Sequence, residues 1–268
     1  MTIKRPFRRK KMPRAPIVLL TDFGLEDHYV GVMKGVIAGL APEAQMIDLT
    51  HQIPPQDVQT AGFHLWASYR YFPEGSIFVA VVDPGVGTER KGLLLSAGGR
   101  FFLGPDNGLF TFILEEDPNF QAYSLINKDY FLPVVSYTFH GRDIFAPCAA
   151  HLFNGAPPAS FGPRVQELVR FPLPKLVEEP GRLRGGIIHV DRFGNLITNI
   201  SAESLRTRQV KGIWFKGRQL PFLRTYAEVK EGEPLAIIGS TGLLEIAVFR
   251  GSAAERFGRE GEVIVEWY

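Results

Sequence analysis

The feature that most constrains the fold is an alternation of short apolar runs with segments of helical spacing, which begins at residue 17. The runs at residues 17–20 and 77–82 have the length and β-branched content of strands buried on both faces. Between them, residues 29–40 show helical spacing, residues 46–49 read as a strand, and a second helix opens at Pro55. This order predicts a mainly parallel, twisted sheet with helices on both faces, and we expect the alternation to continue to about residue 170.

A change of pattern near residue 171 predicts a second, smaller domain. Prolines and charges replace periodicity across residues 171–183, which we interpret as a linker. Beyond it come short apolar segments without helical spacing, at residues 186–190, 196–200, 212–215, 235–238, 244–249 and 263–267. Such segments are typical of a small antiparallel sandwich or barrel. The chain therefore divides into an α/β domain over residues 16–170 and an antiparallel β domain over residues 184–268.

The charge of the chain is distributed unevenly. Seven of its 30 Lys and Arg residues lie before residue 15, in a stretch without apolar periodicity, which we interpret as a disordered basic tail over residues 1–15. The remaining 23 basic residues stand against 28 acidic ones, so we expect no nucleic-acid binding by the folded part. Contact of the tail with RNA or with membrane phosphates is the weaker alternative.

Membrane and export signals are not evident in the sequence. No run approaches the length of a membrane span, and the tail lacks the apolar segment of a secretory signal. Cys148 is the single cysteine, which excludes an intrachain disulfide and a site made of several thiolates. Together these features predict a soluble protein of the reducing cytoplasm.

Acidic residues follow two of the predicted strands at the point where each strand ends. Asp22 and Asp27 come after the first strand, and Asp83 opens a glycine-rich loop that ends in Arg90. Because ligands of open α/β sheets bind at the carboxyl ends of strands, we expect these acids to face one crevice. His140 lies in an otherwise apolar stretch, and histidine is the side chain most readily poised to accept a proton near neutral pH. Asp83, Arg90 and His140 could together hold and deprotonate a water molecule.

The same residues allow other interpretations. A loop Asp–Arg pair can be a structural clamp, and an isolated His140 can simply pack. The acids after the first strand could bind a divalent metal with His28, but no histidine pair stands at ligand spacing, so no metal site is predicted. A nicotinamide dehydrogenase is disfavoured, because the loop lacks the third glycine of the dinucleotide fingerprint and Asp83 would repel a pyrophosphate. Residues 193–195 could be no more than a hairpin turn.

Five motifs, in order along the chain, carry a resemblance to a known family. They are Thr21-Asp22-Phe23-Gly24, Asp83-Pro84-Gly85-Val86-Gly87-Thr88, Gly104-Pro105-Asp106-Asn107-Gly108, Phe139-His140-Gly141-Arg142-Asp143 and Asp191-Arg192-Phe193-Gly194-Asn195-Leu196-Ile197-Thr198-Asn199. Together they resemble the S-adenosyl-L-methionine (SAM) hydroxide adenosyltransferases, the adenosine-forming SAM hydrolases related to fluorinases and chlorinases. The resemblance implies an N-terminal α/β domain, a C-terminal β-barrel and a homotrimer that binds SAM between subunits. It implies SAM as the substrate and no cofactor.

The resemblance also implies roles for residues of the α/β domain. Asp83, Arg90 and His140 match the water-activating triad of the family. Asp22 matches the position that holds the ribose hydroxyls, and Asp27 would lie near the methionyl part. The halogenases have other residues at the positions of Asp83 and Arg90, so this chain keeps the hydrolase form.

Four residues of the second domain match binding positions of the family. Asp191 would receive the amino group of the methionyl part, Phe193 would stack near adenine, and Asn195 would bond the adenine edge. Ser240 would meet the methionyl carboxylate. The implied function is hydrolysis of SAM to adenosine and L-methionine by in-line attack of an activated water or hydroxide at C5′. A SAM or adenosine sensor without turnover and a SAM-dependent halogenase are the alternatives.

Overall fold

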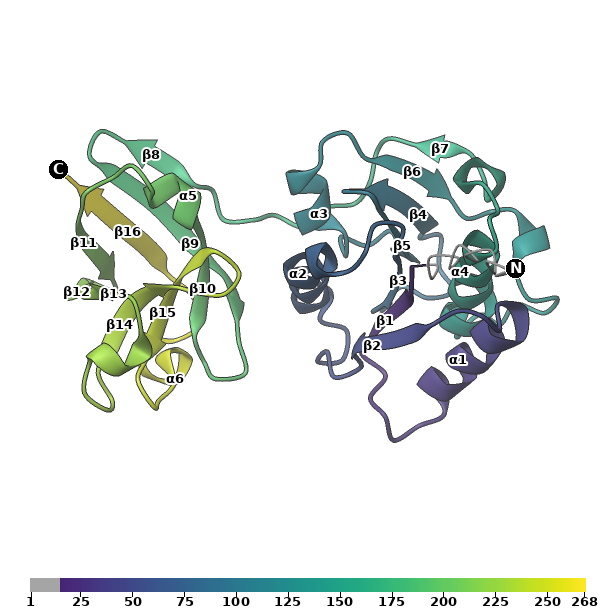
Figure 1. Cartoon of the computed structure of the whole chain (residues 1–268), viewed down its shortest axis with the longest axis horizontal. Coiled ribbons are helices and arrows are strands. Elements are labelled where there is room, and N and C mark those ends of the chain that lie inside the picture. Colours follow the sequence, from purple (N-terminus) through teal and green to yellow (C-terminus); the bar gives the residue numbers. More distant parts are fainter. Residues whose placement is uncertain (1–14) are drawn as a thin grey trace, which may run out of the picture. The chain divides into compact units, whose positions relative to one another are not determined.

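The computed structural model describes residues 15–268, and it divides into two compact units between Phe171 and Pro172. Figure 1 shows an α/β unit, coloured purple to teal, and a β unit, coloured green to yellow. Apart from Ala15, the basic tail predicted for residues 1–15 lies outside the described residues. No helix within residues 15–268 is long and apolar enough to cross a membrane.

The α/β unit is built on a seven-stranded sheet in the order β2-β1-β3-β5-β4-β6-β7. Its strands are β1 (Ile17–Thr21), β2 (Met46–Thr50), β3 (Ile77–Val81), β4 (Gly92–Ala97), β5 (Arg100–Pro105), β6 (Gln121–Ser124) and β7 (Arg164–Val165). Strands β2, β1, β3 and β5 pair in parallel, which confirms the parallel sheet predicted for this domain. Strands β4, β6 and β7 extend it with antiparallel pairs.

The predicted alternation of strands and helices is wrong between β3 and β5, where no helix intervenes, and it resumes with α3. Strands β4 and β5 form a hairpin instead, and only Gly98 and Gly99 separate them. Both glycines have positive φ, at 53° and 74°, which is the backbone of a type I′ turn. The Gly-Gly pair between two apolar runs is a hairpin signal that helical spacing does not reveal.

Helices cover both faces of the sheet (Figure 1). They are α1 (Tyr29–Leu40), α2 (Val58–Ser68), α3 (Thr111–Glu116) and α4 (Ala146–Phe153). Successive strand residues point to opposite faces, so Ile17 and Leu19 join the core under α1 and α4, whereas Val18 and Leu20 join the core under α2 and α3. The same two-sided burial explains why β1 and β3 are apolar throughout.

Helix α2 begins later than the sequence predicts. Pro55 was expected to open it, but Gln56 has a positive φ of 67° and lies in the preceding turn. The Asp57 carboxylate accepts from the Thr60 backbone N at 2.9 Å and so caps the helix start. The Pro55–Gln56 turn is thereby free to contribute to the carboxyl edge of the sheet.

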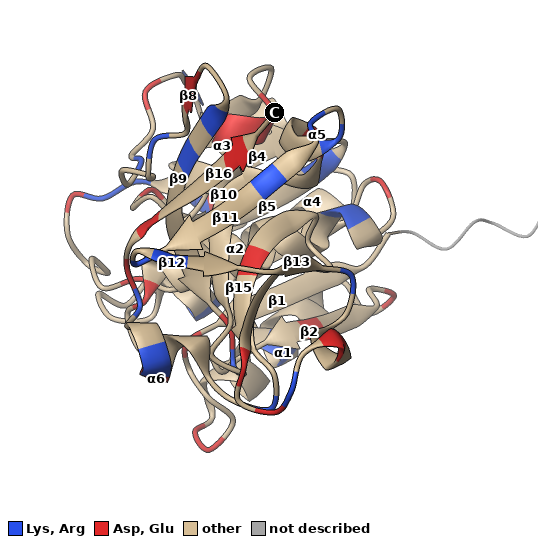
Figure 2. Cartoon of the chain, turned by 90° about the vertical axis from the view of Figure 1, so that its left-hand side faces the viewer, with Lys and Arg blue, Asp and Glu red and all other residues tan. Residues whose placement is uncertain are grey.

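The β unit holds nine strands in one sheet. They are β8 (Val177–Glu179), β9 (Arg182–Val190), β10 (Leu196–Ser201), β11 (Val210–Phe215), β12 (Arg218–Leu220), β13 (Phe222–Leu223), β14 (Pro234–Ile238), β15 (Leu243–Val248) and β16 (Glu262–Trp267), with helices α5 (Ala202–Leu205) and α6 (Ala253–Phe257). Strands β8 and β9 begin inside the segment interpreted as a linker. Figure 2, in which this unit faces the viewer, shows charges of both signs interspersed over it.

The sheet of the β unit nearly closes into a barrel. Its path runs β12-β11-β16-β9-β10-β15-β14-β13, and only Pro221 separates the two strands at its ends. The backbone N of Ala236 in β14 donates to the Pro221 carbonyl at 2.9 Å. Every pairing is antiparallel except β13 with β14. These pairings confirm the smaller antiparallel barrel predicted for the second domain.

Candidate active site

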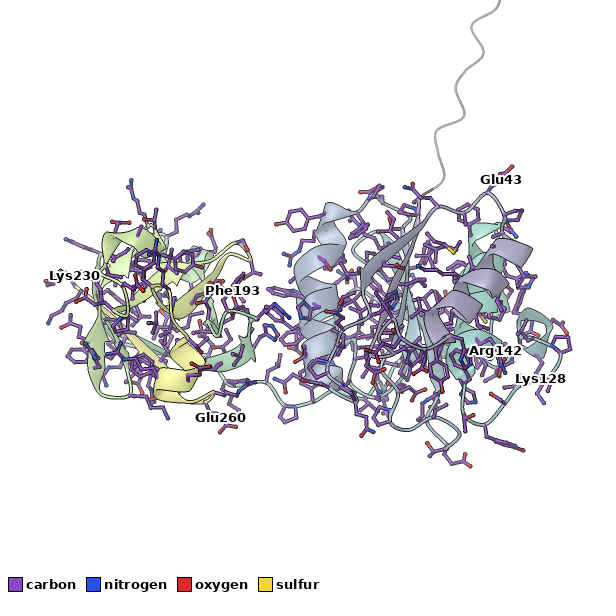
Figure 3. All side chains as sticks on the ribbon, turned by 90° about the horizontal axis from the view of Figure 1, so that it is seen from below. Glu43, Lys128, Arg142, Phe193, Lys230 and Glu260 are labelled. Atoms are coloured by element: carbon purple, nitrogen blue, oxygen red, sulfur yellow. The ribbon has the colours of Figure 1, made fainter. Side chains whose placement is uncertain are left out.

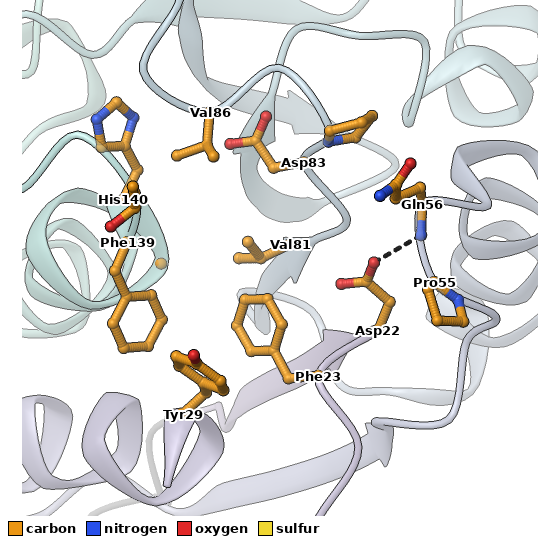
Figure 4. Close-up of a pocket in the computed structure, with 13 residues that line it drawn as sticks. Asp22, Phe23, Tyr29, Pro55, Gln56, Val81, Asp83, Val86, Phe139 and His140 are labelled. Atoms are coloured by element: carbon orange, nitrogen blue, oxygen red, sulfur yellow. Dashed lines mark hydrogen bonds between the residues drawn. The ribbon is translucent and has the colours of Figure 1, made fainter. Parts of the chain in front are cut away.

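A cavity of about 440 Å³ lies where β1 and β3 end (Figure 4). The two strands are parallel neighbours, with Thr21 opposite Val81, so the residues that follow them reach the same edge of the sheet. Asp22 and Asp83 both line the cavity, and His140 lines it from the turn before α4. The structure therefore brings together three of the residues that the sequence singled out.

Asp83, Arg90 and His140 form one connected group. The Arg90 Nε lies 2.9 Å from Asp83 Oδ1, and its Nη2 lies 2.5 Å from Asp83 Oδ2. The same Nη2 lies 2.6 Å from the Nδ1 of His140. The side chains of Asp83 and Arg90 are only 6% and 10% exposed, so water competes weakly for these bonds.

This arrangement defines the protonation of His140. A guanidinium can only donate hydrogen bonds, so the Nδ1 of His140 must accept, and the ring is then neutral with its proton on Nε2. Burial and the adjacent Arg90 charge both lower the pKa of His140 from its ordinary value of 6.5, against the opposing effect of Asp83. The imidazole is thus held neutral beside a cation.

Glycine and asparagine residues shape the loop that carries Asp83. Gly87 has a φ of 78°, and a Cβ there would lie 2.4 Å from the carbonyl oxygen of Tyr137, so only glycine lets the loop lie against the segment before His140. The side-chain amide of Asn107 donates to the carbonyl of Val82 at 2.9 Å and fixes the residue before Asp83. The sequence motif contained Asn107, but its spacing gave no sign of this contact.

A buried acid organises the segment before His140. His140 precedes a π-helical turn, Gly141–Phe145, and Asp143 within that turn is fully buried. Its carboxylate accepts from the backbone N of Ser136 at 2.9 Å, from the Ser136 hydroxyl at 2.8 Å and from the Arg142 Nε at 2.6 Å. Burial alone would raise the pKa of Asp143, but these hydrogen bonds outweigh it and lower the pKa. Asp143 therefore supports the site without lining it.

The acids after β1 lie in different environments. Asp22 lines the cavity, and its Oδ2 accepts from the backbone N of Gln56 at 2.8 Å (Figure 4). Asp27 is exposed and does not line the cavity, so the structure does not bring it to the other predicted residues. Phe23, Tyr29 and Phe139 form an apolar wall, with ring centroids 5.1–5.8 Å apart.

The predicted residues of the second domain meet in a separate cavity of about 780 Å³ within the β unit. It is lined by all four of them, Asp191, Phe193, Asn195 and Ser240. The Asp191 carboxylate accepts from the backbone N atoms of Phe193 and Asn195 at 2.9 and 2.8 Å, and from the Asn195 side chain at 2.9 Å. Phe193, labelled in Figure 3, is 76% exposed. The segment is thus a tight turn and also a wall of the cavity, so the two sequence interpretations are compatible.

Sequence reasoning missed three polar residues of this cavity, Tyr226, Glu245 and Arg250. Glu245 lies in β15, where every residue is buried. An acid within an apolar strand was the signal that could have identified it. Within residues 15–268, no group of three His, Cys, Asp or Glu side chains is placed to hold a metal ion.

The fold and the cavities define a two-domain protein of α/β and β-barrel units, with a candidate small-molecule site in each. The chain belongs to the SAM hydroxide adenosyltransferase family: the N-terminal domain of that family matches residues 17–162, and its C-terminal domain matches residues 185–266. An (R)-S-adenosyl-L-methionine hydrolase of Thermus thermophilus is 46% identical over 258 residues, which cover 92% of this chain and 97% of that protein.

Two further proteins are similar to this chain over most of its length. A fluorinase of an Actinoplanes species is 28% identical over 270 residues, which cover 86% of this chain and 90% of that protein. The crystal structure of an uncharacterized conserved protein from Thermotoga maritima superimposes with a TM-score of 0.84 at 36% identity, over 93% of this chain and 99% of that one. The chain is thus more similar to the hydrolase than to the fluorinase in sequence.

Proposed function

We propose that this chain is an enzyme that hydrolyses SAM to adenosine and L-methionine, by in-line attack of an activated water or hydroxide at C5′. The observation that supports it best is the Arg90 Nη2, which contacts both Asp83 and His140 at the wall of a cavity. Membership of the family and the similarity to a named SAM hydrolase support the same substrate.

The chemistry of SAM accounts for these residue types. Its sulfur is a sulfonium, which departs from C5′ as the neutral thioether of methionine and needs no general acid. Attack by hydroxide on a cation cancels charge in the transition state, so a cavity that excludes water favours the reaction. The apolar wall of Phe23, Tyr29 and Phe139 would provide such surroundings.

The proposed catalytic roles follow from the hydrogen bonds. Asp83 accepts a proton from the attacking water, because the Nδ1 of His140 is already engaged by Arg90. The His140 imidazole, which Arg90 holds at the cavity wall, helps to position the water. Arg90 aligns both residues, because its guanidinium bonds the Asp83 carboxylate and the Nδ1 of His140. The oxygen then bonds to C5′ while the C5′–S electron pair passes to sulfur.

The proposed binding roles divide between the two units. Asp22 accepts from the ribose hydroxyls, and Asp27 lies near the methionyl part once substrate is bound. In the β unit, Phe193 stacks near adenine and Asn195 bonds the adenine edge. The methionyl amino group and carboxylate, which share one end of the substrate, are bound at Asp191 and Ser240.

We also propose that the protein is a homotrimer in which each SAM is bound between subunits. The candidate residues lie in two cavities, one in each unit, and each cavity alone holds part of the set that the proposed substrate requires. The cytoplasm is the proposed location, on the ground of the single cysteine.

Incubation of the purified chain with SAM tests this function. Liquid chromatography with mass detection should find adenosine and methionine in equal amounts, and Asp83→Asn should abolish both while SAM still binds. Binding without any adenosine would favour a sensor. A 5′-halonucleoside that forms only with added chloride or fluoride would favour a halogenase.

A further inference from the structure

Glu245 is a buried acid at the wall of the cavity in the β unit. Its side chain belongs to β15, and the residue is only 5% exposed. The Tyr226 hydroxyl lies 3.2 Å from its Oε2. A phenol is a neutral donor and does not balance a buried negative charge, so this carboxylate requires a cationic partner or protonation.

The charged neighbour of Glu245 is another acid, Asp191. Among the residues that the structure describes, no Lys, Arg or His forms an ion pair with Glu245. Burial raises the pKa of Glu245, and the nearby Asp191 carboxylate raises it further, against the Tyr226 hydrogen bond. Arg250 also lines the cavity, but its guanidinium pairs with Glu231 at 3.2 Å.

The backbone beside Glu245 is shaped to receive its carboxylate. A Cβ on Gly239 would lie 1.7 Å from Glu245 Oε1, so only glycine leaves room for the acid there. The next residue in the chain is Ser240, which lines the same cavity. The carboxylate of Glu245 and the Ser240 residue are therefore neighbours within one wall.

We infer that Glu245, together with Asp191 in the same cavity, binds a cationic N–H group of the ligand and that, in the proposed substrate, this is the α-ammonium of the methionyl part. The inference rests on the proposed function for the identity of the ligand. The sulfonium of SAM has no N–H to donate, and the adenine amine is neutral, so the ammonium alone supplies both charge and donors. Ammonium and carboxylate share one carbon, which agrees with Glu245 beside the proposed carboxylate contact at Ser240.

Calorimetry on the full chain tests this inference with S-adenosylhomocysteine and with its deaminated counterpart, in which hydrogen replaces the amino group. Neither probe has a sulfonium leaving group, so turnover does not interfere. Glu245→Gln should weaken binding of S-adenosylhomocysteine about 10- to 100-fold, because a charge-assisted contact is lost. It should change the affinity for the deaminated probe less than about 2-fold, because that probe never made the contact.

The exposed Glu260 in the same unit offers a matched control, and Glu260→Gln should change neither affinity. A melting curve shows whether the Glu245→Gln variant is folded. If it is not, Glu245→Asp replaces it. This variant keeps the negative charge but moves it away from the ligand, so it should show the same selective loss of S-adenosylhomocysteine binding. Equal losses for both probes, or no loss for either, would overturn the inference, as would failure of the unmodified chain to bind S-adenosylhomocysteine. Selective loss without hydrolysis of SAM would leave the inference intact and remove the proposed function.

Discussion

The Nη2 of Arg90 lies 2.5 Å from Asp83 Oδ2 and 2.6 Å from His140 Nδ1, so one nitrogen joins the loop after β3 to the turn before α4. A guanidinium donates through a rigid planar fork, so it can hold the two acceptors in one geometry. The proposed catalytic role of the group depends on this single side chain.

Arg90→Lys should lower kcat far more than it alters KM. Lysine keeps the charge but not the fork, so it cannot bond Asp83 through two nitrogens and still reach His140. Loss of one or two charge-assisted bonds predicts a fall in kcat of about 10- to 100-fold in steady-state kinetics. Arg206→Lys, at an arginine whose side chain is 72% exposed, is the control and should leave both constants unchanged. An Arg90→Lys variant with wild-type kcat would exclude a role for the fork.

The pH dependence of kcat/KM should reflect the protonation of His140. Its pKa is lowered from 6.5 by burial and by Arg90, so the active neutral form persists below pH 6.5 and kcat/KM should fall only in more acidic buffer. The free energy of unfolding should also fall in acid. As the pH decreases, His140 is protonated in the unfolded chain before it is protonated in the folded chain, so the stability contributed by neutral His140 is lost as the pH falls through the folded pKa. An NMR titration of the ring should give a midpoint below 6.5, and Arg90→Gln should raise it. A midpoint above 6.5 would contradict the neutral assignment.

Asp143→Ala should destabilise the α/β unit as well as lower activity. It leaves the backbone N and the hydroxyl of Ser136 without their acceptor in a buried site. We expect the free energy of unfolding to fall by about 2–3 kcal/mol in urea titrations. Ser136→Ala, which removes only the hydroxyl, should cost about 1 kcal/mol. Equal effects of the two changes would mean that the carboxylate does not organise this segment.

Mixed subunits test whether the site is shared. The Asp83→Ala and Asn195→Ala variants should each have little or no activity alone. Asp83→Ala removes the proposed proton acceptor, and Asn195→Ala removes a proposed adenine contact. In randomly mixed trimers, about a quarter of the sites would combine two intact halves from neighbouring subunits, so activity should return to about that fraction. A mixture that stays as inactive as its components would place each site within one subunit.

Much of the fold was predictable because it depends on local patterns. The apolar runs identified β1 and β3, and helical spacing identified α1. The strand-end rule also placed Asp22 and Asp83 at one cavity, because parallel neighbours deliver their next residues to the same edge.

The rest depends on contacts between distant segments. Nothing in the spacing of Arg90 indicates that it reaches His140, since that contact requires Gly87 to pack against Tyr137. Asp27 lies in the same loop after β1 as Asp22, yet it is exposed. An acid within the apolar run of β15 marked Glu245 as unusual, but strand patterns do not show which buried residue faces a cavity.

The central claim is that a solvent oxygen attacks C5′, and hydrolysis in ¹⁸O water tests it most directly. Direct displacement puts the solvent oxygen into the 5′-hydroxyl of adenosine and leaves methionine unlabelled. Mass spectrometry should therefore find one ¹⁸O on the ribose of adenosine and none on methionine. Adenosine that forms without the label would contradict the account, because no solvent-derived nucleophile could then have reached C5′.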